Sequence, residues 1–188
     1  RQLLDQAFSS VDHLICYSVK ANSNAAILKS FFNMGSGADI VSGGELQRAM
    51  AAGCDPQKIV FSGVGKKRSE IEAALDANIL QFNVESEQEL ELIQDVAKEK
   101  NKKANIALRV NPDVDAKTHP YISTGLQENK FGIDHSLAFD VFKNANEMSH
   151  IEISGIDCHI GSQLIDVEPF RHAKQKLREL ILQLKDVG

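Results

Sequence analysis

Residues 80–112 read LQFNVESEQELELIQDVAKEKNKKANIALRVNP and place one helical segment between two short apolar runs. The first six residues and the last eight have the length and apolar character of buried strands. Between them, residues 86–100 repeat apolar side chains every three or four positions, which is typical of a helix with one buried face. Ser86, followed by Glu89, has the Ser-x-x-Glu spacing of a capping box at a helix start. This stretch therefore predicts a strand, a crossover helix and a second, parallel strand.

The same alternation continues in both directions along the chain. Further apolar runs of strand length lie at residues 13–20, 38–42, 58–63 and 154–163. Further segments with helical spacing lie at residues 24–34, 44–52, 67–77, 136–146 and about 168–184. Alternating strands and helices indicate a parallel sheet, which occurs both in doubly wound folds and in closed (β/α)8 barrels.

Two observations favour the barrel. No Gly-x-Gly-x-x-Gly follows the first run, although a dinucleotide-binding sheet would carry one there. Each run also has one apolar face and one face with polar side chains towards its C-terminal end, as expected where one face meets the helices and the other the barrel axis. The faces of the run at 105–112 are Ile106, Leu108 and Val110 on one side and Ala107, Arg109 and Asn111 on the other.

We therefore expect an α/β fold, a (β/α)8 TIM barrel present as a partial barrel. About six strand–helix units can be recognised, whereas a complete barrel has eight. Because the sequence also begins at Arg1 and not at a methionine, we expect residues 1–188 to be part of a longer protein.

The composition narrows the classes of protein to which the chain can belong. It has 188 residues, a net charge of −5, 43% hydrophobic residues and 25% charged residues. The charge argues against a nucleic-acid surface, and the hydrophobic content argues against disorder. No apolar run approaches the ~20 residues of a membrane span, and no signal peptide is recognisable. We therefore expect a globular cytoplasmic protein.

The three cysteines, Cys16, Cys54 and Cys158, are widely spaced in apolar surroundings and lack a metal-binding spacing. We therefore expect reduced, buried thiols and no metal site.

Lys20 follows the first run within the motif YSVKANSN, residues 17–24. A lysine at a strand end is usually solvated, but in an enclosed site desolvation favours the neutral amine needed for a Schiff base. The motif resembles the Y-A-V-K-A-N motif of pyridoxal-phosphate enzymes with the alanine racemase-like barrel, called fold type III. Ser18 replaces the usual alanine, a small-for-small exchange.

Further segments, in the same order along the chain, resemble the diaminopimelate decarboxylase family of fold type III. They are ADIVSGGEL at 38–46, FSGVGK at 61–66, LRVNP at 108–112, HPYISTGLQENKFGI at 119–133 and CHIGSQ at 158–163. This resemblance implies that Lys20 binds pyridoxal phosphate covalently, that His159 lies against the cofactor ring and that Ser162 contacts its phosphate. A hydrogen-bonded core histidine and an ordinary turn serine are the competing interpretations.

The resemblance assigns further residues to the surroundings of the cofactor. It places Asp39 near the lysine and the cofactor, although a residue at a strand start can equally cap backbone amides. Arg109 is expected in the hydrogen-bond network under the cofactor, with Asp39 or Glu85 as its partner, because a buried guanidinium needs one. A purely structural ion pair is the alternative. Lys130 resembles a lysine that pairs across a dimer interface, and a merely exposed lysine is the alternative.

The implied activity of the full-length protein is the decarboxylation of meso-diaminopimelate to L-lysine and carbon dioxide in a homodimer. The resemblance places the rest of the barrel and a C-terminal β-domain outside these residues. Three alternatives stay open: a related decarboxylase acting on arginine, ornithine or carboxynorspermidine; a non-catalytic pyridoxal-phosphate-binding homeostasis protein; and a class I aldolase, which uses a barrel lysine without a cofactor.

One charged segment has no place in this assignment. Residues 64–68, VGKKR, put three basic side chains between the third run and the next helix. We expect a solvated loop here, with an anion site as the alternative.

We expect residues 1–188 alone to lack decarboxylase activity. The resemblance places the phosphate loop, the acidic residue facing the pyridine nitrogen and the side chains for the distal substrate end beyond Gly188. An assay of carbon dioxide release from diaminopimelate by the isolated segment checks this expectation, and measurable turnover would overturn it.

Overall fold

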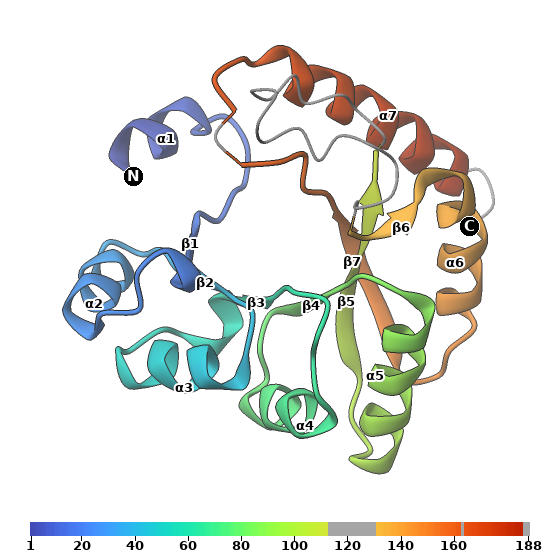
Figure 1. Ribbon diagram of the computed structural model, residues 1–188, viewed down its shortest axis with the longest axis horizontal. Helices are drawn as coiled ribbons and strands as arrows, with labels where there is room; N and C mark the ends of the chain where they lie inside the picture. The colour runs from blue at the N-terminus through green and yellow to red at the C-terminus, as the bar shows by residue number, and fades with distance from the viewer. Residues whose placement is uncertain (113–130, 163, 186–188) are drawn as a thin grey trace.

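The computed structural model describes residues 1–112, 131–162 and 164–185. Its strands are parallel and alternate with helices along the chain (Figure 1). The strands are β1 (Cys16–Ser18), β2 (Gly37–Ile40), β3 (Ile59–Phe61), β4 (Gln81–Val84), β5 (Ala104–Asn111), β6 (Ile133–Asp134) and β7 (Ile151–Asp157). The α-helices are α1 (Gln2–Ala7), α2 (Ala25–Asn33), α3 (Gly43–Ala51), α4 (Arg68–Ala77), α5 (Glu87–Glu99), α6 (His135–Asn146) and α7 (Glu168–Lys185).

The strands form a curved sheet in which β1 to β5 follow each other in sequence order. The free edge of β5 then pairs with β7 along most of its length and with β6 at its C-terminal end. Helices α2 to α5 cover the convex face, and the concave face lies opposite them (Figure 1). Among the described strands β1 pairs with β2 alone, so this part of the chain forms an open, barrel-like sheet.

The strands β1 and β7 differ from the expected runs in ways that affect candidate site residues. The first strand ends at Ser18, and Lys20 lies in the 3-10 turn Val19–Ala21 that follows it. Val19 is completely buried and begins this turn, which takes the chain out of the sheet. The sixth run begins its strand earlier than expected, at Ile151, and its pairing with β5 ends at Asp157. His159 therefore follows strand β7 and does not lie on it.

The short strand β6 was not expected from the sequence. It has two residues, Ile133 and Asp134, which is too short for an alternation of apolar and polar side chains to be visible. Its pairing partners are Val110 and Asn111 of β5, so only the tertiary structure shows that this segment belongs to the sheet.

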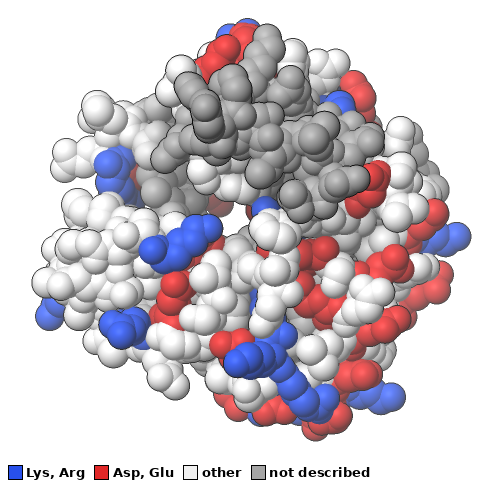
Figure 2. Space-filling model, in the orientation of Figure 1, with Lys and Arg blue, Asp and Glu red and all other residues white. Residues whose placement is uncertain are grey.

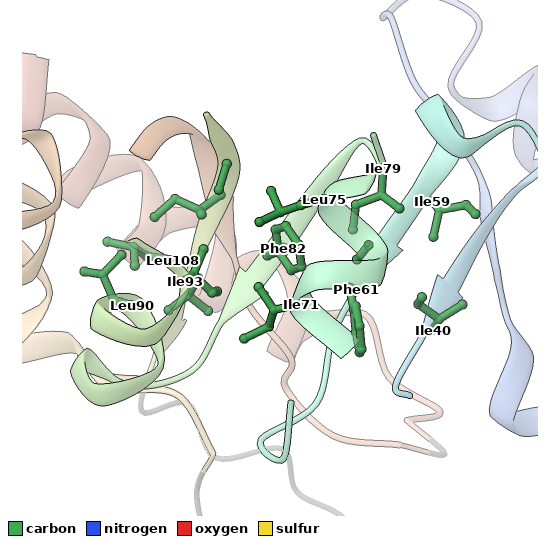
Figure 3. Packing of buried hydrophobic residues seen from close by; sticks show 14 of the residues in the cluster. Ile40, Ile59, Phe61, Ile71, Leu75, Ile79, Phe82, Leu90, Ile93 and Leu108 are labelled. Atoms are coloured by element: carbon green, nitrogen blue, oxygen red, sulfur yellow. The ribbon is translucent and has the colours of Figure 1, made fainter. Parts of the chain in front are cut away.

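The hydrophobic core lies between the convex face of the sheet and the helices. Ile106, Leu108 and Val110 are all fully buried, which confirms the apolar face expected for β5. Figure 3 shows Phe61 and Phe82 from neighbouring strands beside Ile71 of α4, and the two rings are stacked with centroids 6.1 Å apart. Burial of this apolar area is the main stabilising contribution to the fold.

The start of α5 confirms only half of the expected capping box. Ser86 Oγ accepts a hydrogen bond from the Glu89 N–H at 3.2 Å, as expected of an N-cap. The Glu89 carboxylate, however, does not bond back to the Ser86 N–H. Its Oε2 accepts a hydrogen bond from the N–H of Glu85, one residue earlier, at 3.1 Å.

All three cysteines are free; Cys54 is buried, but Cys16 and Cys158 are half-buried, so the expectation of three buried thiols was wrong for two of them.

Figure 2 shows acidic and basic side chains interspersed along the lower part of the face in view, over α4 and α5. No helix in the described ranges is long and apolar enough to cross a membrane.

We predict that Leu90→Ala lowers the free energy of unfolding by about 2–5 kcal/mol, because it leaves a cavity between α5 and the sheet. Leu90 is 2% exposed. Leu137→Ala is the matched control, a helical leucine that is 53% exposed, and it should change stability by less than about 1 kcal/mol. Urea denaturation of the full-length variants measures both values, and equal losses would contradict the assignment of this core.

Candidate active site

A row of polar side chains crosses the concave face of the sheet. Parallel register brings Ser18 of β1 beside Asp39 of β2. The Asp39 carboxylate accepts hydrogen bonds from Ser18 Oγ at 3.1 Å and from Ser62 Oγ, just after β3, at 2.7 Å. Within the described residues no backbone amide donates to this carboxylate, so its observed partners are hydroxyl groups and not the backbone amides of a capping role.

The row continues from β3 to β7 through amide and hydroxyl side chains. Asn83 Nδ2 donates to Ser62 Oγ at 3.1 Å, and Gln81 Nε2 donates to Asn83 Oδ1 at 2.9 Å. Ser154 Oγ of β7 lies 3.1 Å from Gln81 Oε1. A continuous set of hydrogen bonds thus links side chains from five strand segments, as the polar layer of a barrel interior requires.

Arg109 of β5 occupies the centre of a second group of charged side chains. Its Nη1 donates to Glu85 Oε1 at 2.7 Å, which confirms Glu85 as a partner. Glu85 follows β4, its side chain is 2% exposed, and the same oxygen accepts a hydrogen bond from the Gly63 N–H at 2.9 Å. Arg109 Nε lies 3.9 Å from Asp157 Oδ2 at the end of β7. Asp39 does not pair with Arg109, contrary to the other expectation.

Two atoms of this charged group are buried without a hydrogen-bond partner in the described structure. They are Glu85 Oε2 and Arg109 Nε. A buried polar atom without a partner costs free energy, so such atoms point to a bound molecule or solvent that completes their hydrogen bonds.

The electrostatics of the group are dominated by acidic side chains. Burial raises the pKa of Asp157; Arg109 opposes this rise, whereas Glu85 and Asp39 add to it. Three carboxylates therefore lie near one guanidinium at the C-terminal ends of β2, β4 and β7, and the amine of Lys20 lies at their rim.

Lys20 and His159 lie at the rim of this group. Lys20 is exposed, whereas His159 is exposed on one side and packs against neighbouring residues on the other. Lys20 forms no hydrogen bond or ion pair with another residue in the described part of the chain. His159 is close enough to both cations that Arg109 and Lys20 lower its pKa, although burial is the largest cause of the decrease. Asp39 and Glu85 partly oppose this shift.

A cavity of about 490 Å³ adjoins His159. It lies between residues 158–161 after β7 and helix α7, including Phe170 and Leu177. Apart from His159, none of the charged residues described above borders it. Small-molecule sites commonly have volumes of ~300–1,000 Å³, so this cavity is large enough for one. Ser162 follows directly at the exposed rim, whereas Lys130 lies outside the described residues.

The expectation of a solvated loop at residues 64–68 was wrong for Lys66. The Lys66 side chain is completely buried and forms an ion pair with Glu89 of α5, with Nζ and Oε1 2.5 Å apart. The sequence does not distinguish which of the three consecutive basic residues 66–68 turns inward.

The chain as a whole, residues 1–188, matches the family described as "Pyridoxal-dependent decarboxylase, pyridoxal binding domain". The chain therefore belongs to this family of pyridoxal-binding domains. The expected fold class is confirmed by the parallel sheet and by the structural neighbours given below.

Relatives of this chain include diaminopimelate decarboxylases, as the sequence resemblance implied. The enzyme of Pseudomonas aeruginosa is 54% identical over 182 residues, which are 97% of this chain and 44% of that protein. The structure of the Helicobacter pylori enzyme complexed with L-lysine has 50% identity and a TM-score of 0.93, covering 98% of this chain and 47% of that one. An arginine decarboxylase of Paramecium bursaria Chlorella virus, 23% identical with a TM-score of 0.83 over 100% of this chain and 48% of that one, shares the fold. The chain thus spans less than half the length of these relatives.

We predict that His159 titrates below its ordinary pKa of 6.5 in the cofactor-free full-length protein. Since His159 binds a proton more readily in the unfolded chain than in the folded protein, it lowers the free energy of unfolding as the pH falls below about 6.5. Lys20→Met removes one of the nearby cations and should raise the pKa of His159, whereas Lys29→Met on α2 should leave it unchanged. NMR titration of labelled histidine measures the shift, and no change in the Lys20 variant would contradict the proximity of the two side chains.

Proposed function

We propose that the full-length protein containing this chain decarboxylates meso-diaminopimelate to L-lysine and carbon dioxide, with pyridoxal phosphate bound covalently at Lys20. The observation that carries this proposal is the position of Lys20, an exposed amine without a partner in the described structure, at the rim of the Asp39–Glu85–Arg109 group. Membership of the pyridoxal-binding family and 54% identity to diaminopimelate decarboxylases support it.

The residues present fit this cofactor. Lys20 supplies the amine that binds its aldehyde. Glu85 Oε2 and Arg109 Nε are buried atoms that still need partners. When bound, pyridoxal phosphate supplies an electron-withdrawing ring that accepts the electron pair left by the departing carboxylate.

Each side chain has a role that follows from its environment. His159 has a lowered pKa, so near neutral pH it presents an uncharged, flat imidazole that can lie against an aromatic ring. Asp39 is held by two hydroxyl donors and places a negative charge near Lys20 and His159. Arg109 is kept in place by Glu85 and holds the hydrogen-bond network under the cofactor. Ser162, beside Gly161, offers a hydroxyl to the phosphate.

Lys20 also moves protons in this proposal. While it is not bound to the cofactor, its exposed amine at the rim of the site would serve as an acid–base group that holds or donates a proton. The carboxylates around Arg109 attract the cationic amino groups that a diamino acid carries.

We further propose that residues 1–188 form part of the cofactor-binding barrel, that the rest of the barrel and a C-terminal β-domain lie outside them, and that the protein is a cytoplasmic homodimer. The free thiols support a reducing compartment. The net charge of −5 and the interspersed charges of Figure 2 support a small-molecule substrate and no nucleic-acid partner.

We predict that borohydride reduction of the full-length protein with pyridoxal phosphate labels Lys20, as peptide mapping would show. Lys20→Ala should lower kcat/KM for diaminopimelate at least about a hundredfold, the lower range for a positioned acid–base group. Lys29→Ala is the control and should retain activity and labelling.

The outcomes separate the competing functions. A label on another lysine, or none, contradicts the cofactor assignment. A label at Lys20 without any turnover indicates a cofactor-binding protein. Release of carbon dioxide from arginine, ornithine or carboxynorspermidine in place of diaminopimelate indicates a related decarboxylase.

A further inference from the structure

The ion pair between Lys66 and Glu89 is the most deeply buried charged pair in the described part of the chain. The two side chains are 0% and 8% exposed, and they lie behind the polar row of the concave face, between the sheet and α5. Burial raises the pKa of Glu89, and Lys66 opposes that rise. A buried ion pair often contributes less to the free energy of unfolding than apolar residues of the same size would. Its presence here therefore indicates a role other than stability.

Lys66 Nζ uses all three of its hydrogen-bond donors. It donates to the Gly63 carbonyl at 2.8 Å, to the Asn83 carbonyl at 2.7 Å and to Glu89 Oε1 at 2.5 Å. The ammonium group therefore ties together the chain after β3, the strand β4 and the first turn of α5. An apolar side chain could fill the same space, but it could not bind two carbonyl groups and a carboxylate at once.

The second oxygen of Glu89 extends these contacts to Glu85. Glu89 Oε2 accepts a hydrogen bond from the Glu85 N–H at 3.1 Å, which anchors the main chain of Glu85 to the first turn of α5. The Glu85 side chain is held by Gly63, whose N–H donates to Glu85 Oε1 at 2.9 Å. Gly63 has a φ of 95°, a conformation that favours glycine, and its carbonyl is bound by Lys66.

The neighbouring strand–helix unit provides an internal comparison. Glu45, in the first turn of α3, accepts a hydrogen bond from the Val41 N–H at 2.8 Å, just as Glu89 does from Glu85. In the described residues, however, no lysine or arginine pairs with Glu45. A lysine therefore pairs with the helix glutamate only in the β4–α5 unit of these two, and in that unit the strand is followed by Glu85, the partner of Arg109.

We propose that Lys66 and Glu89 are a positioning pair that fixes Glu85, and through Glu85 the guanidinium of Arg109, in the orientation in which they receive the cofactor. Neither residue touches substrate or cofactor in this scheme. The role in receiving the cofactor rests on the proposed function. The fixing of Glu85 by the pair concerns the cofactor-free protein and is tested separately.

The first experiment measures hydrogen exchange at the amides of Gly63 and Glu85 in the cofactor-free full-length protein. Lys66→Met should make both exchange at least about tenfold faster, because the loss of hydrogen bonds to a charged group favours local opening by about that factor. The matched control is Lys100→Met, which removes an exposed ion pair with Asp76 and should leave both amides unchanged. If Lys66→Met fails to fold, Lys66→Met/Glu89→Gln, which leaves no unpaired buried charge, takes its place.

The second experiment measures the Kd for pyridoxal phosphate in a double-mutant cycle. Lys66→Met should weaken binding at least about tenfold in the otherwise unchanged protein, but less than about twofold when Glu85→Gln is already present, because residues that act through one another are not additive. A purely structural role would weaken binding equally in both backgrounds.

The results distinguish this proposal from the proposed function. Unchanged exchange at Gly63 and Glu85 overturns the positioning pair, and so does faster exchange with an unchanged or additive effect on Kd. A wild-type protein that binds no pyridoxal phosphate at Lys20 overturns the proposed function, and the exchange rates then still decide whether the pair holds Glu85.

Discussion

The ion pair between Arg109 and Glu85 is the interaction on which the rest of the concave face depends. Glu85 is almost fully buried, and the guanidinium 2.7 Å away is the oppositely charged partner that a buried carboxylate requires. The same carboxylate receives the Gly63 N–H, and Arg109 also reaches towards Asp157. One ion pair thus brings together the C-terminal ends of β3, β4, β5 and β7. In a barrel that end is where catalytic groups meet.

The two faces of the sheet divide stability and chemistry between them. On the convex face, apolar side chains pack under α2 to α5 and supply the hydrophobic contribution to folding (Figure 3). On the concave face, hydroxyl, amide and carboxylate groups bond to one another in a continuous row from β1 to β7. Because each polar group in this row is held by its neighbours, the acidic residues are oriented before any ligand arrives, which lowers the cost of binding.

Different parts of the site were predictable to different degrees. Lys20 and its motif could be recognised because they are contiguous. That Arg109 pairs with a carboxylate followed from the need of a buried guanidinium for one, but Asp39 and Glu85 both remained open as the partner. Lys66 was not predictable, because three basic residues in a loop are usually solvated and only packing against Phe61 and α5 shows which one is buried. His159 was placed on a strand that ends two residues earlier, because its apolar neighbours continue the pattern beyond the last pairing with β5.

By itself, the sequence determined the alternation of strands and helices, the apolar face of each strand and the chemical types of the site residues, because these depend on local periodicity and on contiguous motifs. Only the tertiary structure decided which carboxylate pairs with Arg109, that Asp39 binds hydroxyl groups and that Lys66 turns inward to Glu89. These contacts join residues on different strands and helices, often more than twenty positions apart. Their partners are selected by the register of the sheet and by burial, which no local pattern of residues specifies.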